Sequence, residues 1–290
     1  MAQQTRIDVV LAYFQRFMER FPSIEALAAA SHDDVTAAWS GLGYYRRARM
    51  LRDGAIVVQE RFGGRLPRDV DELQEIPGIG RYTAGAIASI AFRKRAPIVD
   101  GNVARVLARL FAIDGAEAWS RAESLVAASA SPRDFNQGLM EIGALICTPR
   151  NPSCDRCPVR GYCVALQSGR VDELPRAKAK PATRQMTIAL YVVTNRGRVM
   201  MQREKGALMR DMFHLPHGDT SLLTGKPLRV RDATLVGSFP HSITNRRIIF
   251  QVYRATGSRQ QATWIRPKDL PTIPHPSYVR KALQLAGICK

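Results

Sequence analysis

The chain has 290 residues, with 43 lysines and arginines against 25 aspartates and glutamates and a formal net charge of +18 at pH 7. A content of 46% hydrophobic and 23% charged residues excludes a disordered or collagen-like chain. No stretch approaches the roughly 20 apolar residues that span a bilayer, and Arg6 and Asp8 interrupt the region where a secretion signal would need its apolar core. We therefore expect a cytoplasmic protein that does not associate with membranes, and at roughly 100–200 residues per domain its length predicts two domains.

The basic charge is concentrated in the last third of the chain. Residues 1–185 contain 26 lysines and arginines against 20 acidic residues, whereas residues 186–290 contain 17 against 5. Such an excess favours a polyanionic partner, because basic side chains neutralise phosphates and release counterions. The alternative is that the charge serves solubility alone. We interpret it as favouring nucleic acid.

The first part of the chain is predicted to be all-α. Apolar residues recur at spacings of three and four between Ile7 and Met18, as on one face of an amphipathic helix. Glycines and prolines separate the further apolar segments. Helices are predicted at 23–30, 33–40, 44–62, 69–75, 81–92, 101–113, 117–130 and 134–146.

After residue 170 the pattern changes to a linker followed by a mixed α+β domain. Leu174–Gln185 contains two prolines and several basic residues, which is typical of an exposed linker. Alternating apolar and β-branched residues then predict strands, and the last apolar segment predicts a helix. The strands are expected at Thr187–Val193, Arg198–Arg203, Arg247–Tyr253 and Thr263–Ile265, and the helix at Ser277–Ala286.

Four of the five cysteines lie within 17 residues, in the pattern C-x6-C-x2-C-x5-C. A reducing cytosol argues against structural disulfides at these positions. Four thiolates in a single short loop suit a [4Fe–4S] cluster, whereas zinc sites usually use two separate pairs of cysteines. We predict an iron–sulfur cluster, with zinc as the alternative, on Cys147, Cys154, Cys157 and Cys163.

A P-G-I-G turn joins two predicted helices within residues 73–85. Its glycines allow the backbone to approach a ligand closely, and the N–H groups at the start of the next helix suit a DNA phosphate. An ordinary αα-hairpin is the alternative. We predict that Gly78, Gly80 and Arg81 contact the DNA backbone without reading its sequence.

A V-D-G-N segment follows at residues 99–102, where Asp100 or Asn102 could simply cap the next helix. Together with the hairpin, the four-cysteine loop, Gln4 and the segment Gly41–Arg46, it resembles the endonuclease III superfamily, and within it the MutY-type adenine DNA glycosylases. The resemblance implies a helix-hairpin-helix glycosylase domain at 1–170 with its [4Fe–4S] loop at 147–163. It further implies a linker at 171–185 and a MutT/Nudix-like 8-oxoguanine-recognition domain at 186–290.

The resemblance also implies roles for individual residues in removing adenine from A:8-oxoguanine or A:G pairs in double-stranded DNA. Asp100 matches the carboxylate that faces the sugar cation, and Tyr82 and Asn102 match residues that align the sugar and this carboxylate. Substrate-binding positions are implied for Gln4 and Tyr44, which would wedge into the base stack, and for Gln137, which would bond the extruded adenine.

Two features of the sequence bear on the expected activity. Bifunctional relatives carry a lysine where this chain has Tyr82, so we expect a monofunctional glycosylase without imine chemistry. The family's general acid is a glutamate just before the methionine that aligns with Met1. We therefore expect weak excision from the chain as printed and a glutamate encoded upstream; a start codon placed too late and a truncated product both explain this arrangement.

The second domain lacks the glutamate-rich Nudix box, so phosphohydrolysis is not expected. Where the resembling family reads 8-oxoguanine with an F-S-H loop, this chain has Ile243-Thr244-Asn245. The resemblance implies that Thr244 and Asn245 contact the lesion, and a polar hairpin turn is the alternative.

Three other functions remain open at the level of the sequence. They are an endonuclease III-type glycosylase for oxidised pyrimidines, a non-catalytic protein that binds and shields the lesion, and a zinc-binding transcription factor. We expect a monomer that associates with the nucleoid through DNA.

Overall fold

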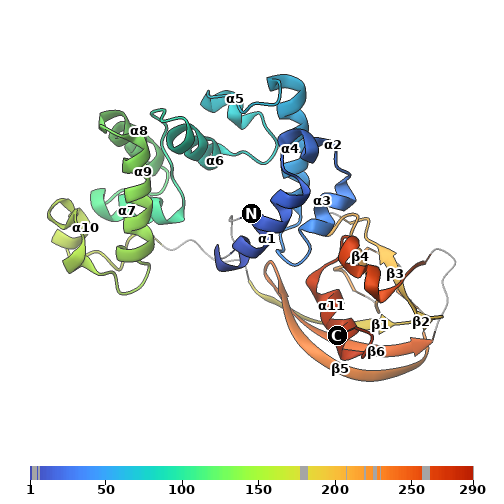
Figure 1. Cartoon of the computed structure of the whole chain (residues 1–290). Coiled ribbons are helices and arrows are strands. Elements are labelled where there is room, and N and C mark those ends of the chain that lie inside the picture. The colour runs from blue at the N-terminus through green and yellow to red at the C-terminus, as the bar shows by residue number, and fades with distance from the viewer. Residues whose placement is uncertain are drawn as a thin grey trace. The chain divides into compact units, whose positions relative to one another are not determined.

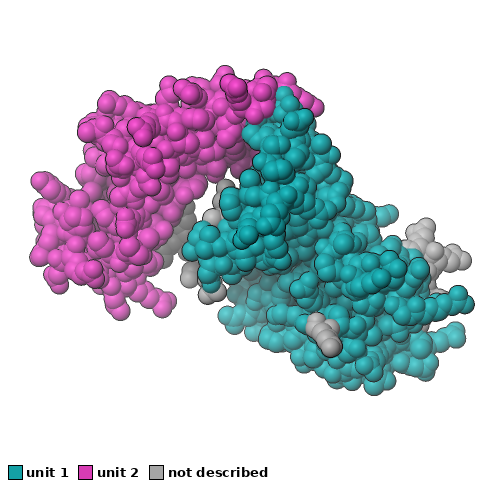
Figure 2. All heavy atoms as spheres, in the orientation of Figure 1, with its two compact units in different colours: residues 1–59, 181–290 teal, residues 60–180 magenta. Residues whose placement is uncertain are grey.

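The computed structural model describes residues 1, 5, 7–176, 182–206, 208–218, 220–224, 227–228, 230–256 and 262–289. The chain forms two compact units, one from residues 1–59 with 181–290 and the other from residues 60–180 (Figure 2). Helices make up the chain before residue 168, and strands begin at residue 184 (Figure 1). Within the described ranges, no helix combines the length and the apolar character needed to cross a membrane.

The N-terminal helices of the first unit begin where side chains satisfy free backbone N–H groups. Ser23 and Ser31 each accept a hydrogen bond from the backbone three residues further on, which caps the helices that follow them. Phe17 packs edge-on against the buried ring of Trp39 at a centroid distance of 6.0 Å. These helices are α1 (Ile7–Arg20), α2 (Ile24–Ala29), α3 (His32–Ala38) and α4 (Arg46–Phe62).

The second unit is helical throughout its described residues. Its helices are α5 (Val70–Gln74), α6 (Arg81–Ala86), α7 (Gly101–Phe111), α8 (Ala118–Ala128), α9 (Pro132–Glu141) and α10 (Val164–Gln167). The segments predicted as helices at 81–92 and 134–146 are confirmed, but each ends in a π-helical turn, η1 (Ile87–Ala91) and η2 (Ile142–Ile146). Such turns insert an extra residue into the helical repeat and are frequent near functional sites.

The C-terminal part of the first unit contains two sheets. In one sheet the order is β1-β6-β5, with β1 parallel to β6 and β5 antiparallel to it. In the other, β3 pairs with β2, β4 and β7. The strands are β1 (Arg184–Val192), β2 (Thr194–Asn195), β3 (Arg198–Arg203), β4 (Phe213–His214), β5 (Arg231–Ile243), β6 (Arg246–Thr256) and β7 (Thr263–Ile265).

A short 3-10 helix, η5 (Pro267–Thr272), and the closing helix, α11 (Ser277–Leu285), complete this part of the chain. The ring of Tyr278 on α11 stacks on Phe250 of β6 at a centroid distance of 4.6 Å, and both side chains are fully buried. The predicted helix at 277–286 is therefore confirmed, and it covers the core of the first sheet.

Residues 1–59 belong to the same compact unit as the sheets because polar contacts join them. Arg203 pairs with Asp33 at 2.6 Å, and Arg49 donates a hydrogen bond to the carbonyl of Arg210 at 2.7 Å. The Tyr45 hydroxyl donates to the carbonyl of His275 at 3.3 Å. The boundaries of these compact units differ from those of the expected domains, 1–170 and 186–290. The expected domains describe parts of the chain that fold independently, and they stay a prediction.

Two features of the strand region differ from the sequence-based expectation. β1 begins at Arg184, inside the expected linker 171–185, and Leu174, near the start of that linker, is buried. β5 was not predicted, because Gly237 and Pro240 interrupt its pattern. An edge strand tolerates proline, and pairing along almost the whole of β6 holds β5 in place despite two register shifts.

Candidate active site and metal centre

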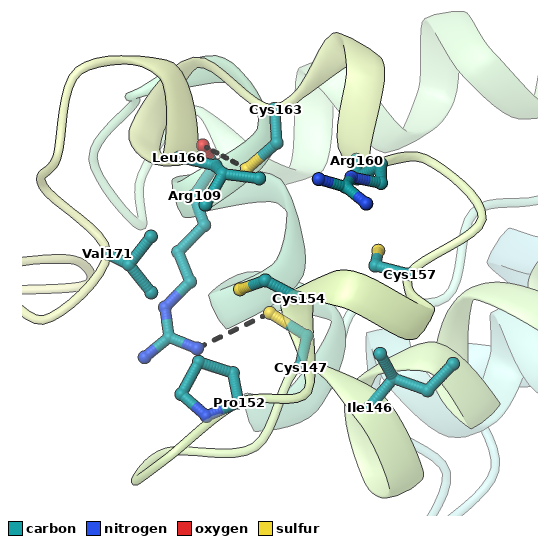
Figure 3. A pocket seen from close by; sticks show the side chains of 10 residues that line it. All are labelled: Arg109, Ile146, Cys147, Pro152, Cys154, Cys157, Arg160, Cys163, Leu166 and Val171. Carbon is teal, nitrogen blue, oxygen red and sulfur yellow. Dashed lines mark hydrogen bonds between the residues drawn. The ribbon is translucent and has the colours of Figure 1, made fainter.

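The four clustered cysteines line one cavity (Figure 3). Cys147 follows the π-helical turn η2, and the 3-10 turns Cys154–Arg156 and Arg160–Tyr162 place the other three. Apolar side chains and two arginines complete the lining, namely Ile146, Pro152, Leu166, Val171, Arg109 and Arg160. The loop therefore folds its thiols inward towards a shared, largely apolar space.

Arg109 of α7 holds this loop from the inside. Its guanidinium donates to the Cys147 Sγ at 3.4 Å, to the carbonyl of Thr148 at 2.8 Å and to the carbonyl of Leu174 at 2.8 Å. The Cys163 Sγ lies 3.5 Å from the carbonyl oxygen of Arg109. Because Arg109 is only 3% exposed, it places a buried positive charge beside the sulfurs.

The electrostatics of the cavity fit a group that carries positive charge. Burial raises the pKa of the Cys154 thiol, and the neighbouring Cys147, Cys163 and Cys157 raise it further, while Arg109 lowers it. Four thiolates so close together repel one another unless a cationic centre binds them. Among the described residues, no group of three or more His, Cys, Asp or Glu side chains is placed to hold a metal ion. The donor set and its shared cavity nevertheless fit a polynuclear centre that the thiols surround.

Asp100 lies at the start of α7, where its carboxylate caps the helix. Its Oδ1 accepts a hydrogen bond from the backbone N–H of Val103 at 2.7 Å, and its Oδ2 accepts one from Asn102 Nδ2 at 3.3 Å. The capping role expected from the sequence is therefore real. It also fixes the direction of the carboxylate, whose side chain remains partly exposed.

Tyr82 lies at the second position of α6, and its hydroxyl is 3.9 Å from the sulfur of Met140. Burial raises the pKa of this phenol, and the negative charge of Asp100 raises it further. Tyr82 is therefore neutral at physiological pH and lies within the electrostatic reach of Asp100. The structure brings Tyr82, Asp100 and Asn102 together in the second unit.

Arg105 connects these residues to the cysteine loop. Its guanidinium donates to Asn102 Oδ1 at 2.9 Å, to the carbonyl of Gly143 at 2.7 Å and to the carbonyl of Cys147 at 2.7 Å. A Cβ added to Gly143 would lie 2.8 Å from the Cβ of Asn102, so only glycine allows η2 to pack this closely against α7. The asparagine beside Asp100 and the first cysteine are thus joined through one buried side chain.

Arg105 and Arg109 were not singled out from the sequence. The sequence pattern that could have identified them is the spacing of two arginines four residues apart in the otherwise apolar helix Gly101–Phe111. Both arginines are buried in the structure. A charged side chain on a buried helical face requires partners, and here those partners are backbone carbonyls from distant loops.

The predicted hairpin is present as α5 and α6. Gly78 adopts a left-handed φ of 88°, and Gly80 is the N-cap of α6. Gly85 allows the second helix to approach the backbone of Pro97, since a Cβ there would lie 2.1 Å from its carbonyl oxygen. The guanidinium of Arg81 stacks over the ring of Trp119 at 4.0 Å. The hairpin geometry is confirmed, and the DNA contacts of Gly78, Gly80 and Arg81 stay a prediction.

The remaining predicted residues do not all join this group. Gln137 of α9 is exposed in the second unit, and its side-chain amide donates to the carbonyl of Arg133 at 3.3 Å. Tyr44 is 54% exposed and belongs to the first unit. Gln4 lies outside the described residues.

Thr244 and Asn245 form the two-residue turn between β5 and β6. Thr244 has a left-handed φ of 54°, and its hydroxyl donates to the carbonyl of Ile243 at 2.7 Å. The Asn245 amide donates to the carbonyl of Ala182 at 3.1 Å, while Arg246 donates to the Thr244 hydroxyl at 3.2 Å. The polar hairpin turn is therefore present, and lesion contact by these residues stays a prediction.

Comparison with known proteins agrees with this arrangement. Residues 1–129 match the HhH-GPD superfamily base excision DNA repair protein family, and residues 147–163 match the iron-sulfur binding domain of endonuclease III. A solved thermostable thymine-DNA glycosylase superposes with a TM-score of 0.52 and 30% identity, covering 57% of this chain and 80% of that one. The fold and the site thus define a helix-hairpin-helix protein of base excision repair with an iron–sulfur domain, whose cofactor is a [4Fe–4S] cluster.

The similar sequences narrow the class further. The chain is 34% identical over 232 residues to the adenine DNA glycosylase of Buchnera aphidicola subsp. Schizaphis graminum, covering 77% of this chain and 67% of that protein. It is 48% identical over 188 residues to the adenine DNA glycosylase of Rattus norvegicus, covering 60% of this chain and 36% of that one. The chain belongs to the MutY-type adenine DNA glycosylase family, although it spans only about a third of the length of the rat relative.

Proposed function

We propose that this protein is a monofunctional DNA glycosylase that hydrolyses the N-glycosidic bond of adenine paired with 8-oxoguanine or guanine in double-stranded DNA. The observation that carries the proposal is the grouping of Asp100 and Asn102, at the start of α7, with Tyr82 on the second helix of the hairpin, in a chain of the adenine DNA glycosylase family. Chemistry on a stacked base requires that the nucleotide be extruded first, at a cost of a few kcal/mol.

Asp100 is the residue that faces the reacting sugar in this proposal. Adenine leaves with the bonding electron pair, so the sugar carries positive charge until water adds to it, and a carboxylate held nearby stabilises that charge, as in glycoside hydrolysis. The water supplies the hydroxyl that the sugar gains, and its proton balances the one that adenine takes up. The hydrogen bonds from Val103 and Asn102 fix the carboxylate in one orientation, so that it need not reorganise as the charge develops. Pre-alignment of this kind lowers the barrier only if the geometry is held rigidly.

Tyr82 supports the monofunctional assignment. An imine with the sugar requires an amine nucleophile, whereas Tyr82 presents a phenol whose pKa is raised by burial and by Asp100. The hydroxyl therefore acts as a neutral hydrogen-bonding group beside the sugar. Strand cleavage through an imine to this residue is not expected.

The iron–sulfur cluster would be held by Cys147, Cys154, Cys157 and Cys163. When bound, it cross-links the loop through four thiolates and so stabilises the fold of residues 147–163. Arg109 offsets part of the negative charge of the four thiolates, because its guanidinium is buried against the Cys147 sulfur. Arg105 links the carbonyl of Cys147 to Asn102. A cysteine loop that is held in place therefore also holds Asn102 in place beside Asp100.

The C-terminal part is proposed to be a MutT/Nudix-like module that reads the lesion, with Thr244 and Asn245 at its contact point. The turn between β5 and β6 is exposed and is followed by two arginines, Arg246 and Arg247, which suit DNA phosphates. The protein would act as a monomer on DNA in the cytoplasm, associated with the nucleoid.

The test is excision from a labelled duplex that contains one A:8-oxoguanine pair, followed by alkaline cleavage, under single-turnover conditions. Wild-type protein should cut the adenine strand only, at a low rate, and Asp100→Asn should reduce this rate further, by at least roughly 100-fold, because a positioned charge stabiliser is worth that much. A duplex with C opposite 8-oxoguanine is the control. Tight binding to the duplex with the A:8-oxoguanine pair, with no product, would refute the glycosylase assignment and support a non-catalytic protein that binds and shields the lesion.

A further inference from the structure

The loop before α4 holds Tyr44 in an unusual backbone conformation. Gly41 and Gly43 have φ values of 105° and 71°, and Tyr44 itself has a φ of 47°. Glycine adopts such angles freely, but a bulky residue in the left-handed region costs on the order of 1–2 kcal/mol. A strained conformation of this kind persists only where surrounding contacts determine it. We therefore expect contacts around Tyr44 that hold its backbone in this conformation.

The carbonyl of Gly43, which forms the peptide bond before Tyr44, receives two hydrogen bonds. Trp39 Nε1 donates to it at 3.1 Å, and Arg47 Nη2 donates to it at 3.3 Å. Trp39 is only 1% exposed, so its indole is a fixed anchor within the helical core. The two donors together fix the orientation of this peptide plane and therefore the direction in which Tyr44 leaves the loop.

Arg47 also contacts the ring of Tyr44 itself. The guanidinium carbon lies 5.3 Å from the Tyr44 ring centroid and 5.4 Å from that of Trp39. Cation–π contacts of this type favour arginine, because its planar group stacks on aromatic faces. The Tyr44 side chain is thus supported on one side, while 54% of its surface stays exposed.

The same guanidinium reaches the N-terminal segment. Arg47 Nη1 donates to the carbonyl of Met1 at 2.7 Å, and Nη2 donates to the Thr5 hydroxyl at 3.0 Å. Burial lowers the pKa of Arg47, while Tyr44 raises it. One arginine therefore joins the loop that carries Tyr44 to Met1 and Thr5.

We propose that Arg47 is a positioning residue that holds Tyr44 in the orientation needed to enter the base stack. The proposal rests on the proposed function, because it assumes that Tyr44 displaces a base. Arg47 acts through Tyr44 and need not touch the DNA. Lysine cannot replace it, since a single ammonium group cannot stack between two rings while donating to Gly43 and Thr5.

The experiment uses the full chain and a duplex with 2-aminopurine next to an A:8-oxoguanine pair, whose fluorescence rises when stacking is lost. At saturating protein, Arg47→Lys should lower the equilibrium constant for unstacking about tenfold relative to wild type, as expected for the loss of a charged hydrogen bond and a cation–π contact. Arg46→Lys is the matched control, because Arg46 is exposed at the first position of the same helix. It should leave the fluorescence signal unchanged.

A double-mutant cycle separates positioning from a general structural role. In a Tyr44→Ala background, Arg47→Lys should change the signal less than about twofold, because the side chain that Arg47 positions has been removed. Circular dichroism and thermal unfolding check that each variant is folded, and Arg47→Gln replaces Arg47→Lys if the latter is not.

Several results would overturn the proposal. The positioning role is refuted if Arg47→Lys gives the same fluorescence as wild type. It is also refuted if Arg47→Lys loses the same amount of fluorescence in the wild-type and the Tyr44→Ala backgrounds. Either result leaves the glycosylase assignment intact. Wild-type protein that binds the duplex but never unstacks it, or that does not prefer the lesion, refutes the proposed function and this inference together.

Discussion

Replacing Arg105 by methionine tests the connection between the cysteine loop and the neighbourhood of Asp100. Arg105 is 8% exposed and donates hydrogen bonds at 2.7–2.9 Å to Asn102, Gly143 and Cys147. Methionine fills much of the same volume, but it leaves three acceptors without their donor. Each unsatisfied buried group costs about 1–3 kcal/mol, and the aliphatic contacts that methionine keeps recover part of the loss. We expect a decrease of about 3–5 kcal/mol in the free energy of unfolding.

The assay is denaturant unfolding of the cluster-loaded protein, followed by circular dichroism and by the cluster absorbance in the visible range. The two signals should shift to lower denaturant together, because the loop and α7 share the lost bonds. Arg133→Met, at an exposed position of α9, is the control and should change stability by less than about 0.5 kcal/mol. A loss below about 1 kcal/mol for Arg105→Met would refute the idea that these bonds hold the loop to α7.

Three further outcomes are expected. Gly143→Ala should destabilise the protein by about 1–3 kcal/mol, because the added Cβ would meet α7. Gly138→Ala is the control and should be neutral or slightly stabilising, because there is open space around this glycine. Equal unfolding midpoints for the two variants would contradict the close packing of η2 against α7. Cys157→Ser should reduce the iron content per chain and the absorbance near 400 nm, and undiminished iron would remove it from the ligand set. Burial tends to raise the pKa of Glu204, but hydrogen bonds from Thr224 and the backbone outweigh this and lower it. Its stabilising contribution is therefore complete above the unfolded-state pKa and is lost as pH falls through the lower folded-state value, so urea midpoints measured from pH 6 to pH 3 should fall less steeply in Glu204→Gln.

Local signals in the sequence were sufficient for most of the helices. The periodic apolar positions, with glycine and proline at the boundaries, place α4, α7 and α9 within a few residues of their observed bounds. These signals depend on contacts between residues three or four apart and on backbone preferences, which the sequence expresses directly. The four-cysteine loop and the α5–α6 hairpin were recognisable for the same reason, since their chemistry lies in a short segment.

The strand β5 could not be predicted in this way. Its residues are largely exposed, and Gly237 and Pro240 argue against a strand when the segment is considered alone. What stabilises it is the pairing with β6, whose alternate residues Ile248, Phe250 and Val252 are buried in the core. The buried apolar face of β6 thus determines that residues 231–243 form a strand.

By itself, the sequence determined the helical first part, the cysteine loop and the hairpin, because residue type and spacing along the chain express each of them, whereas the choice of Asp100 as the candidate carboxylate came from the family resemblance. Only the tertiary structure decided that Arg105 joins Asn102 to Cys147, that Arg109 is buried beside the thiols, and that Arg47 supports Tyr44. The physical reason is that an arginine has a long side chain and five donors, and its partners are backbone carbonyls and rings brought close by folding. No pattern in the sequence specifies which of these groups will lie within hydrogen-bonding distance.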